Sequence, residues 1–330
     1  MIRSRVIGTG AYVPPRILSN HDLEKMVKTS DEWIATRTGI KERHIADEES
    51  ATDIAVKAAK KAVESASLSA DEIDLIIVAT VTSDMVFPST ACFVQSRLGI
   101  KKNIPAFDIS AACSGFLYGL DIADKYIKNG AAKKVLVAGV DVFSRIIDWN
   151  DRNTCVLFGD GAGAVVLSAE RGNRGLLSSH LHSNGDHWRL LYTPSNIYSS
   201  PFKTHSRVHS HKHDEPYLKM EGNKVFKLAV QAMGETCQEA LEHNDLKPAD
   251  VTFLIPHQAN IRIINATAEK TGISAEKVYI NVDRYGNTSA GSIPIALDEL
   301  AHSGRLKSGD ILLMAAFGGG LTWASAVVRW

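Results

Sequence analysis

The chain has 330 residues, of which 45% are hydrophobic, enough to build one large domain or two of ordinary size. Its 37 basic and 37 acidic side chains give a net charge of zero, so no overall field favours a nucleic acid or an anionic membrane as partner. No stretch approaches the ~20 apolar residues of a membrane-spanning helix, and the first residues lack the apolar core of a signal peptide. We therefore expect a globular protein of the cytoplasm with neither nucleic acid nor membrane as a partner.

The order of predicted helices and strands repeats along the chain. Residues 53–66 have alanine and valine at helical spacing and are followed by the apolar run 75–81, which predicts a helix and then a buried strand. The same order returns in a helix predicted at 222–244 and a strand predicted at 251–255. The segments that contain these two strands, SADEIDLIIV and KPADVTFLIP, are similar, which indicates an internal duplication.

The agreement between the two parts extends further. A helix ending near Gly99 leads to a strand in 104–110, and a helix ending near Gly272 leads to a strand in 278–283. Strands rich in glycine and alanine then follow at 133–141, 161–169, 310–320 and 322–330. We predict an α/β protein made of two duplicated halves, 1–172 and 173–330, with a long loop or flap at about 183–221.

The four cysteines occur singly, without the CxxC spacing of a zinc ribbon or the pattern of a disulfide framework. They are Cys92, Cys113, Cys155 and Cys237. Most are expected to be buried small hydrophobes, and no metal site is expected from them.

Cys113 lies between a predicted strand and a predicted helix. The segment DISAACSGF ends the strand, and residues 116–130 then have helical spacing, with Lys125 and Lys128 in the last turn and Gly130 as the stop. The N–H groups at the start of a helix stabilise a thiolate, so we expect the thiol pKa of Cys113 to fall below ~8.5. A buried cysteine tolerated beside small residues is the alternative explanation.

His257 and Asn287 are the candidate partners of this thiol. His257 directly follows a predicted strand, in the loop PHQAN, and Asn287 lies in the turn RYGNTSAGS, which corresponds in the second half to the turn of Cys113. An imidazole N–H and an amide N–H can together stabilise the enolate that forms when a carboxylate departs as CO2. That pattern favours decarboxylative Claisen chemistry, whereas a hydrolytic cysteine site would use the histidine as a base. Taken singly, a loop histidine or an asparagine in a tight turn also has a purely structural explanation.

Five motifs together resemble those of one enzyme family. DISAACSGF, FGDGAGAVVL, IPHQANIRI, DRYGNTSAGSIP and AFGGGLTWASAVVRW are similar to those of β-ketoacyl-[acyl-carrier-protein] synthase III, over nearly the whole chain. The resemblance implies a thiolase-like five-layer αβαβα fold and a homodimer. It also implies that an acyl group, acetyl by default, moves from coenzyme A to a cysteine, and that malonyl-acyl carrier protein then decarboxylates and condenses with it to initiate fatty-acid synthesis. Coenzyme A enters as a thioester substrate, and no cofactor is implied.

The same resemblance assigns catalytic roles. Cys113 is implied as the nucleophile, and His257 and Asn287 as the pair that supports decarboxylation. The backbone donors of Cys113 and Gly319 are implied as the oxyanion hole, although a glycine needed only for close packing would look the same in the sequence.

Binding residues are implied as well. A helix is expected to begin with a capping box from Thr29 to Glu32. Trp33 and Arg37 are four residues apart and share one face of this helix. Alone, these two residues would also suit an ordinary amphipathic surface. The residues implied in coenzyme A binding are Thr29, Trp33, Arg37, Arg152, Gly222, Asn223, Phe226 and Asn260. Those implied in the acyl pocket are Phe158, Phe317 and, from the neighbouring subunit, Phe87. Those implied to meet the acidic carrier protein are Gln258, Ala259, Asn260, Ile261 and Arg262.

The segment 193–218 is longer than the resemblance leads us to expect and is rich in histidine. Some relatives with an expanded loop here condense aryl or longer acyl thioesters in secondary metabolism, so such a condensing enzyme is an alternative function. A non-catalytic module that binds acyl groups or carrier protein is a more distant alternative. Alternate histidines could ligate Zn²⁺ or Ni²⁺, but we favour a solvated flap because no nearby cysteine completes a site. These histidines are His205, His209, His211 and His213.

Three other enzyme classes fit the sequence less well. A thiolase would need a second cysteine near the C-terminus, but none follows Cys237. The long-chain elongating synthases use a second histidine where this chain has Asn287. A dinucleotide-dependent oxidoreductase is disfavoured because the glycines of GDGAGA precede a strand-like segment and not a helix.

Overall fold

Two mixed β-sheets form the frame of the protein in the computed structural model, which describes residues 2–194 and 217–330. Within these residues the first sheet has the order β1, β7, β6, β4, β5, and the second has the order β11, β12, β13, β8. The strands of the first are β1 (Ile2–Tyr12), β4 (Leu75–Ala79), β5 (Ala106–Ile109), β6 (Lys134–Val142) and β7 (Asp160–Arg171). Those of the second are β8 (Gly175–Ser183), β11 (Phe253–Pro256), β12 (Ile311–Gly318) and β13 (Thr322–Arg329).

The two sheets have the same order of parallel and antiparallel pairings. In the first, β5 pairs with β4 and β4 with β6 in parallel, while β6 with β7 and β7 with β1 are antiparallel. In the second, β11 with β12 is parallel, and β12 with β13 and β13 with β8 are antiparallel. Val278 adds a parallel bridge to Leu254 of β11, in the position that β5 has in the first sheet. This agreement supports the duplication that the sequence indicates, while the boundary between 172 and 173 stays a prediction.

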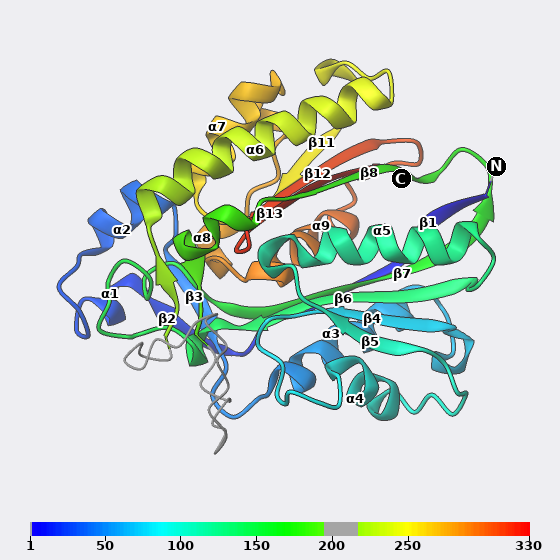
Figure 1. The fold of residues 1–330 in the computed structure, drawn as a ribbon, viewed down its shortest axis with the longest axis horizontal. Helices are drawn as coiled ribbons and strands as arrows, with labels where there is room; N and C mark the ends of the chain where they lie inside the picture. The colour runs from blue at the N-terminus through cyan, green and yellow to red at the C-terminus, as the bar shows by residue number, and fades with distance from the viewer. Residues whose placement is uncertain (1, 195–216) are drawn as a thin grey trace.

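Helices cover the outer face of each sheet and fill the space between the sheets, which gives five layers (Figure 1). α3 and α4 pack on the first sheet from outside, α6 and α7 pack on the second, and α5 and α9 lie between the two. Their bounds are α3 (Ala51–Ser65), α4 (Thr90–Arg97), α5 (Gly115–Lys128), α6 (Gly222–His243), α7 (Ile261–Thr271) and α9 (Ser292–His302). The expected thiolase-like αβαβα fold is confirmed.

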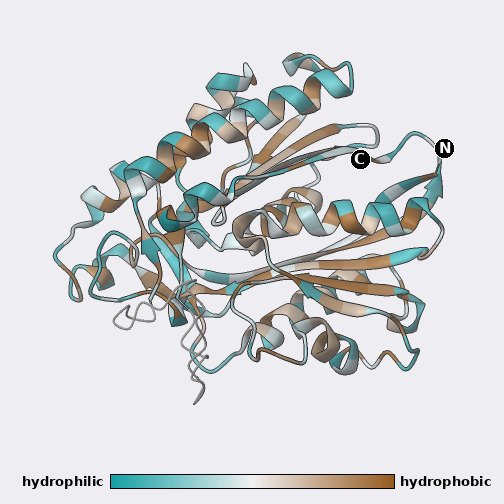
Figure 2. Ribbon diagram, in the orientation of Figure 1, coloured by the Kyte–Doolittle hydropathy of each residue, from teal (hydrophilic) through white to brown (hydrophobic). Residues whose placement is uncertain are grey.

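Hydrophobic residues run along the central strands of both sheets (Figure 2). β4 is buried along its whole length, as expected of a central strand covered on both faces. The middle layer joins the two sheets into one core, in which Phe116, Leu120 and Ile127 of α5 are almost completely buried. Burying each such side chain stabilises the fold by roughly 1.5–3 kcal/mol.

Shorter elements complete the described part of the chain. They are β2 (Arg16–Ser19), β3 (Glu42–Ile45), β9 (Leu191–Tyr192), β10 (Lys219–Met220), α1 (Asn20–Leu23), α2 (Asp31–Thr38) and α8 (Val282–Tyr285). β9 and β10 pair antiparallel within the flap expected at about 183–221. The histidines of that flap, His205, His209, His211 and His213, lie outside the described residues. No helix in the described ranges is long and apolar enough to cross a membrane.

One predicted strand is wrong. Residues 278–283 form no strand, because Val278 makes only an isolated bridge and α8 begins at Val282. The physical reason is Gln258, whose side-chain oxygen accepts the N–H groups of Asn281 and Val282 at 3.0 and 3.2 Å. A buried amide therefore satisfies donors that a neighbouring strand would otherwise take. The other helices and strands expected from the sequence are present, with ends shifted by a few residues.

Candidate active site

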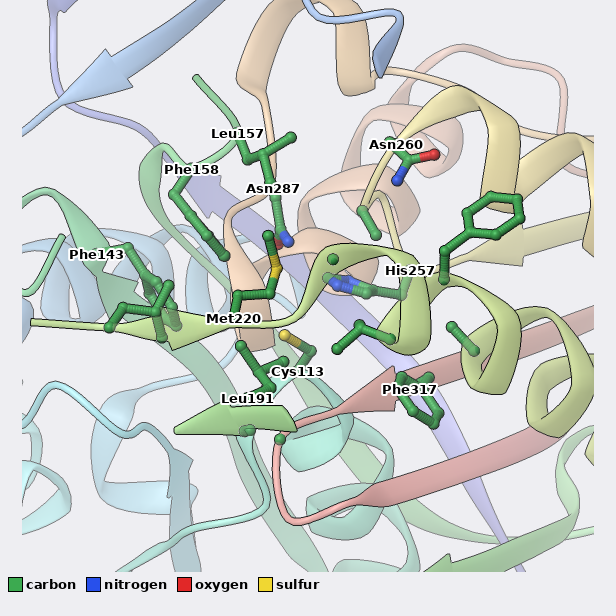
Figure 3. A pocket seen from close by; sticks show the side chains of 18 of the residues that line it. Cys113, Phe143, Leu157, Phe158, Leu191, Met220, His257, Asn260, Asn287 and Phe317 are labelled. Carbon is green, nitrogen blue, oxygen red and sulfur yellow. The ribbon is translucent and has the colours of Figure 1, made fainter. Parts of the chain in front are cut away.

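A cavity of about 1090 Å³ lies at the carboxyl ends of the central strands, and its walls come from both sheets and the helices that follow them. Cys113, His257 and Asn287 all line it, and their side chains point into the same space (Figure 3). They are only 6%, 2% and 7% exposed. The fold thus brings together three residues that lie far apart in the sequence.

Cys113 lies in a tight turn, Ala112–Ser114, between β5 and the start of α5. Ala112 has a φ of 46°, a left-handed conformation that costs an ordinary residue roughly 1–3 kcal/mol. The turn packs against the end of β12, where a Cβ on Gly318 would lie 2.6 Å from the backbone nitrogen of Cys113. Glycine at 318 therefore lets the second sheet approach the backbone of the candidate nucleophile.

Burial dominates the ionisation of the Cys113 thiol. It raises the pKa of Cys113 to about 12; the hydroxyl of Ser289, which donates to Sγ at 3.4 Å, opposes this rise, and the negative charge of Asp141 adds to it. The expectation of a lowered pKa is therefore wrong, because removal from water outweighs the helix terminus. The first turn of α5 has no side-chain cap, since Ser114 Oγ donates to the carbonyl of Thr322. Its N–H groups can still act on charge that develops during a reaction.

The raised pKa of Cys113 predicts how the rate of its alkylation by iodoacetamide depends on pH. Because the thiolate is the reactive form, the rate should rise about tenfold per pH unit from pH 7 to pH 9, a range well below the pKa of about 12. Quantifying the alkylated Cys113 peptide by mass spectrometry measures the rate, and the exposed Cys92 provides an internal comparison for access. A rate that levels off near pH 7 would show instead that the helix terminus outweighs burial.

His257 follows β11, and its ring is held as a neutral imidazole. Its backbone N–H donates to the carbonyl of Ala315 at 2.7 Å, which fixes the loop against β12. In the ring, Nδ1 lies 2.6 Å from Oγ of Ser292. Burial lowers the pKa of His257 to about 3, so at neutral pH the ring is uncharged and carries one N–H donor.

The Asn287 side chain is oriented by its own turn. Its backbone N–H donates to the carbonyl of Leu157 at 2.9 Å, and its carbonyl accepts from the N–H of Gly159 at 3.1 Å. Its side-chain Oδ1 accepts from the N–H of Ser289 at 2.9 Å. Because the oxygen is engaged there, the NH₂ group is left to face the cavity as a donor.

A thiol and two neutral donors suit covalent catalysis followed by stabilisation of negative charge on a carbonyl oxygen. A hydrolytic site would need the histidine to take a proton from the thiol and from water. An imidazole whose pKa is lowered to about 3 is a poor base for either proton at neutral pH. The burial of the imidazole therefore favours the enolate-stabilising role over the hydrolytic one.

Comparison with known proteins gives the family. The family descriptions "3-Oxoacyl-[acyl-carrier-protein (ACP)] synthase III" and "3-Oxoacyl-[acyl-carrier-protein (ACP)] synthase III C terminal" match residues 107–185 and 241–330. The beta-ketoacyl-[acyl-carrier-protein] synthase III of Thiobacillus denitrificans is 53% identical over 331 residues, which cover 100% of both chains. This chain belongs to the β-ketoacyl-[acyl-carrier-protein] synthase III family.

Solved structures agree with membership of the synthase III family. The crystal structure of 3-oxoacyl-[acyl-carrier-protein] synthase III from Aquifex aeolicus superposes with a TM-score of 0.91 at 51% identity and covers 99% of this chain and 100% of that one. The priming beta-ketosynthase from the R1128 polyketide biosynthetic pathway has a TM-score of 0.90 at 34% identity, over 98% of this chain and 95% of that one.

The residues that the synthase III resemblance implies in coenzyme A binding gather around the cavity. Those that line it are Trp33, Arg37, Gly222, Asn223, Phe226 and Asn260. The guanidinium carbons of Arg37 and Arg152 lie 4.7 and 4.9 Å from the centroid of the Trp33 ring, although Arg152 itself does not line the cavity. An aromatic face beside two permanent cations suits a nucleotide with phosphate groups.

Thr29 neither caps α2 nor lines the cavity, contrary to expectation. The N-cap of α2 is Ser30, whose hydroxyl accepts from the N–H of Trp33 at 3.1 Å. The capping box expected from Thr29 to Glu32 is therefore wrong: the cap lies one residue later, and the tryptophan at the third helical position has no acceptor to complete a box. The carboxylate of Glu24 accepts the N–H of Asp31 at 2.6 Å and thereby satisfies another donor of the first turn. Thr29 does not line the cavity.

The five residues implied in carrier-protein docking differ in exposure. Arg262 is exposed, and its guanidinium lies 5.2 Å from the ring of Phe226. Gln258 is only 1% exposed, and its amide donates to the carbonyls of Pro256 and Tyr279. Gln258 is therefore a structural link inside the protein and offers no surface to a partner, which corrects the expectation. The other three, Ala259, Asn260 and Ile261, are partly exposed.

Aromatic side chains shape the inner part of the cavity. Phe158 and Phe317 line it as expected, whereas Phe87 does not and is 82% exposed on its own chain. Sequence reasoning missed Phe143, whose ring stacks on that of Phe158 with centroids 4.6 Å apart. It also missed Leu191 and Met220, which the short strands β9 and β10 carry to the cavity wall (Figure 3). Gly319 lines the cavity near Ala112.

Proposed function

We propose that this protein condenses an acyl-CoA with malonyl-acyl carrier protein, with Cys113 as the carrier of the acyl group. The observation that carries the proposal is the convergence of a buried thiol with two neutral hydrogen-bond donors, from His257 and Asn287, in one cavity. Membership of the synthase III family supports the same reaction class independently. The reaction releases coenzyme A and CO₂ and starts a fatty-acid chain.

The first half-reaction loads Cys113. The sulfur attacks the thioester carbonyl, and coenzyme A departs as a thiol with the proton that Cys113 loses. We assign the N–H groups of Cys113 and Gly319 as donors to the oxyanion that forms in between. The close approach of Gly318 to the backbone nitrogen of Cys113 supports this assignment, because it brings the two backbone segments together.

The second half-reaction forms the carbon–carbon bond. The N–H groups of His257 and Asn287 donate to the thioester carbonyl of the malonyl group, and loss of CO₂ leaves an enolate whose negative charge they stabilise. The enolate carbon attacks the acyl carbonyl on Cys113, and the thiolate leaves and regains a proton. Both donors are neutral before the reaction. They therefore favour the enolate over the malonyl ground state mainly through two directed hydrogen bonds, and long-range charge contributes less.

Two surfaces are assigned to the substrates. Trp33, Arg37 and Arg152 are the proposed contacts for the nucleotide of coenzyme A, and Gly222, Asn223, Phe226 and Asn260 are the proposed contacts for its pantetheine arm. Arg152 is included through its contact with the Trp33 ring, whereas Thr29 does not line the cavity and is left out of this set. Arg262, with Ala259, Asn260 and Ile261, is the proposed docking point for the acidic carrier protein.

A second copy of the chain is the proposed partner in a homodimer. β5 is the edge strand of the first sheet, and the nearby loop exposes Met85, Val86 and Phe87 by 54%, 63% and 82%. Backbone N–H groups of Thr90 and Ala91 donate to Asp108 of β5, which ties this loop to the edge. An open strand edge beside large exposed apolar side chains favours association, and Phe87 then belongs to the acyl pocket of the partner.

The proposed reaction uses the coenzyme A thioester as a substrate and needs no metal or other cofactor. The cytoplasm is the proposed location, because it keeps cysteines reduced and all four cysteines here are free.

Intact mass spectrometry tests the proposed function. The protein is incubated with acetyl, branched, medium-chain and aromatic acyl-CoA thioesters, and malonyl-acyl carrier protein is then added. We expect one acyl adduct per chain and a condensed product on the carrier protein after the second addition. Retained binding without an adduct would support the non-catalytic alternative, and a preference for aromatic or long primers would support the role in secondary metabolism.

The stacked rings of Phe143 and Phe158 are expected to favour short primers. Phe143→Leu removes one ring from the cavity wall, so the ratio of kcat/KM for octanoyl-CoA to that for acetyl-CoA should rise by about tenfold. Phe93→Leu, on α4 and away from the cavity, is the matched control and should leave the ratio unchanged. A ratio that is the same in both variants would show that Phe143 does not limit the primer.

A further inference from the structure

A buried hydroxyl at the start of α9 contacts the ring of His257. Ser292 is 2% exposed, and its Oγ lies 2.6 Å from Nδ1 of the imidazole. It belongs to the same NTSAGS turn that supplies Asn287, so one short segment supports both of the donors that face the cavity. This contact reaches the nitrogen that lies away from the substrate carbonyl in the proposed reaction.

A contact from Gln258 indicates which group donates in the hydrogen bond between Ser292 and His257. The backbone N–H of Gln258 donates to Ser292 Oγ at 3.4 Å, so the hydroxyl oxygen is engaged as an acceptor. Gln258 is itself held in place, because its side-chain oxygen accepts the N–H groups of Asn281 and Val282. A hydroxyl has one hydrogen, and among the contacts of the described residues the acceptor left for it is Nδ1 of His257.

The direction of this hydrogen bond decides which ring nitrogen carries the proton. A neutral imidazole that accepts at Nδ1 is protonated at Nε2. With Nε2–H toward the cavity, the ring donates to a carbonyl or enolate oxygen. With the other tautomer, the lone pair of Nε2 would face that oxygen and repel it.

We propose that Ser292 is a positioning residue that holds His257 in the Nε2–H tautomer, so that the ring donates to the oxygen of the malonyl thioester during decarboxylation. This inference rests on the proposed function. Burial of the ring lowers the pKa of His257 to about 3 and thereby excludes the doubly protonated form at neutral pH. The neutral ring then has two possible tautomers, and its surroundings determine which one is populated.

Ser292→Ala tests the inference through the two half-reactions. Decarboxylation of malonyl-acyl carrier protein should fall by roughly 10- to 100-fold, the range found for residues that orient a metal-bound histidine. Loading of Cys113 from acetyl-CoA should stay within about twofold of wild type. Ser292→Thr keeps the hydroxyl and should restore most of the rate, and Ser303→Ala, at the other end of α9, is the matched control with no expected effect.

The tautomer can also be measured directly in the unaltered protein. With ¹⁵N-labelled histidine, the ring signals of His257, assigned by their loss in His257→Asn, should show a protonated Nε2 and an unprotonated Nδ1. A proton on Nδ1, or decarboxylation by Ser292→Ala at the wild-type rate, would overturn the inference while wild type still loads and condenses. A wild-type protein that fails to load Cys113 would overturn the proposed function itself.

Discussion

Cys113→Ser is expected to abolish loading from acetyl-CoA, with a loss of roughly a thousandfold or more in rate. A hydroxyl is a much weaker nucleophile than a thiol, and the His257 imidazole in the same cavity, with its pKa lowered to about 3, cannot act as its base at neutral pH. Intact mass spectrometry measures the loss as the absence of the acyl adduct. Condensation with malonyl-acyl carrier protein should disappear with it, because the acyl intermediate never forms.

Two further variants separate the chemistry of Cys113 from its packing. Serine places a hydroxyl in a site that is only 6% exposed, which costs about 1–3 kcal/mol if the group finds no partner. Cys113→Ala removes the thiol without adding a polar group, so it should also lose the adduct but keep more stability. Cys92→Ser changes an exposed cysteine and should load like wild type. An acyl adduct on Cys113→Ala would refute the assignment of the nucleophile.

Local patterns predicted most of the frame of this protein. The apolar run at 75–81 predicted β4 because a strand covered on both faces has no polar alternation. The spacing after Cys113 predicted α5 because one buried stripe imposes a helical period. The three candidate catalytic residues were also predictable, since each follows a strand or its counterpart in the duplicated half, where α/β sheets gather their functional loops.

Contacts between distant segments could not be predicted from such patterns. The bonds of Gln258 to Asn281 and Val282 turned a predicted strand into a bridge and a short helix. The pKa of Cys113 depends on how completely the second half of the chain buries it, and a helix terminus read from local spacing gave the opposite direction. Phe143 joins the cavity wall beside Phe158, on which its ring stacks, and no local period in the sequence indicates this.

His257→Ala and Asn287→Ala are each expected to reduce decarboxylation of malonyl-acyl carrier protein by roughly 10²–10³-fold. Each variant removes one of the two donors proposed for the enolate oxygen. Loading of Cys113 should fall much less, because its oxyanion is assigned to backbone N–H groups. Separate assays of CO₂ release and of the acyl adduct measure the two half-reactions, and equal loss in both would refute this division of roles.

Asn287→Asp separates the donor from its place in the fold. Aspartate can still accept the N–H of Ser289 through one oxygen, but it turns an anionic oxygen, not an NH₂ group, toward the enolate. Decarboxylation should therefore fall at least as far as in Asn287→Ala, although the alanine variant alone leaves the N–H of Ser289 without its acceptor. A wild-type rate in Asn287→Asp would mean that the amide orients the turn and does not touch the reacting oxygen.

The pH dependence of decarboxylation tests the protonation state of His257. Since burial lowers the pKa of His257 to about 3, its ring stays neutral from pH 8 to pH 5, and no step in the wild-type rate over that range should come from this residue.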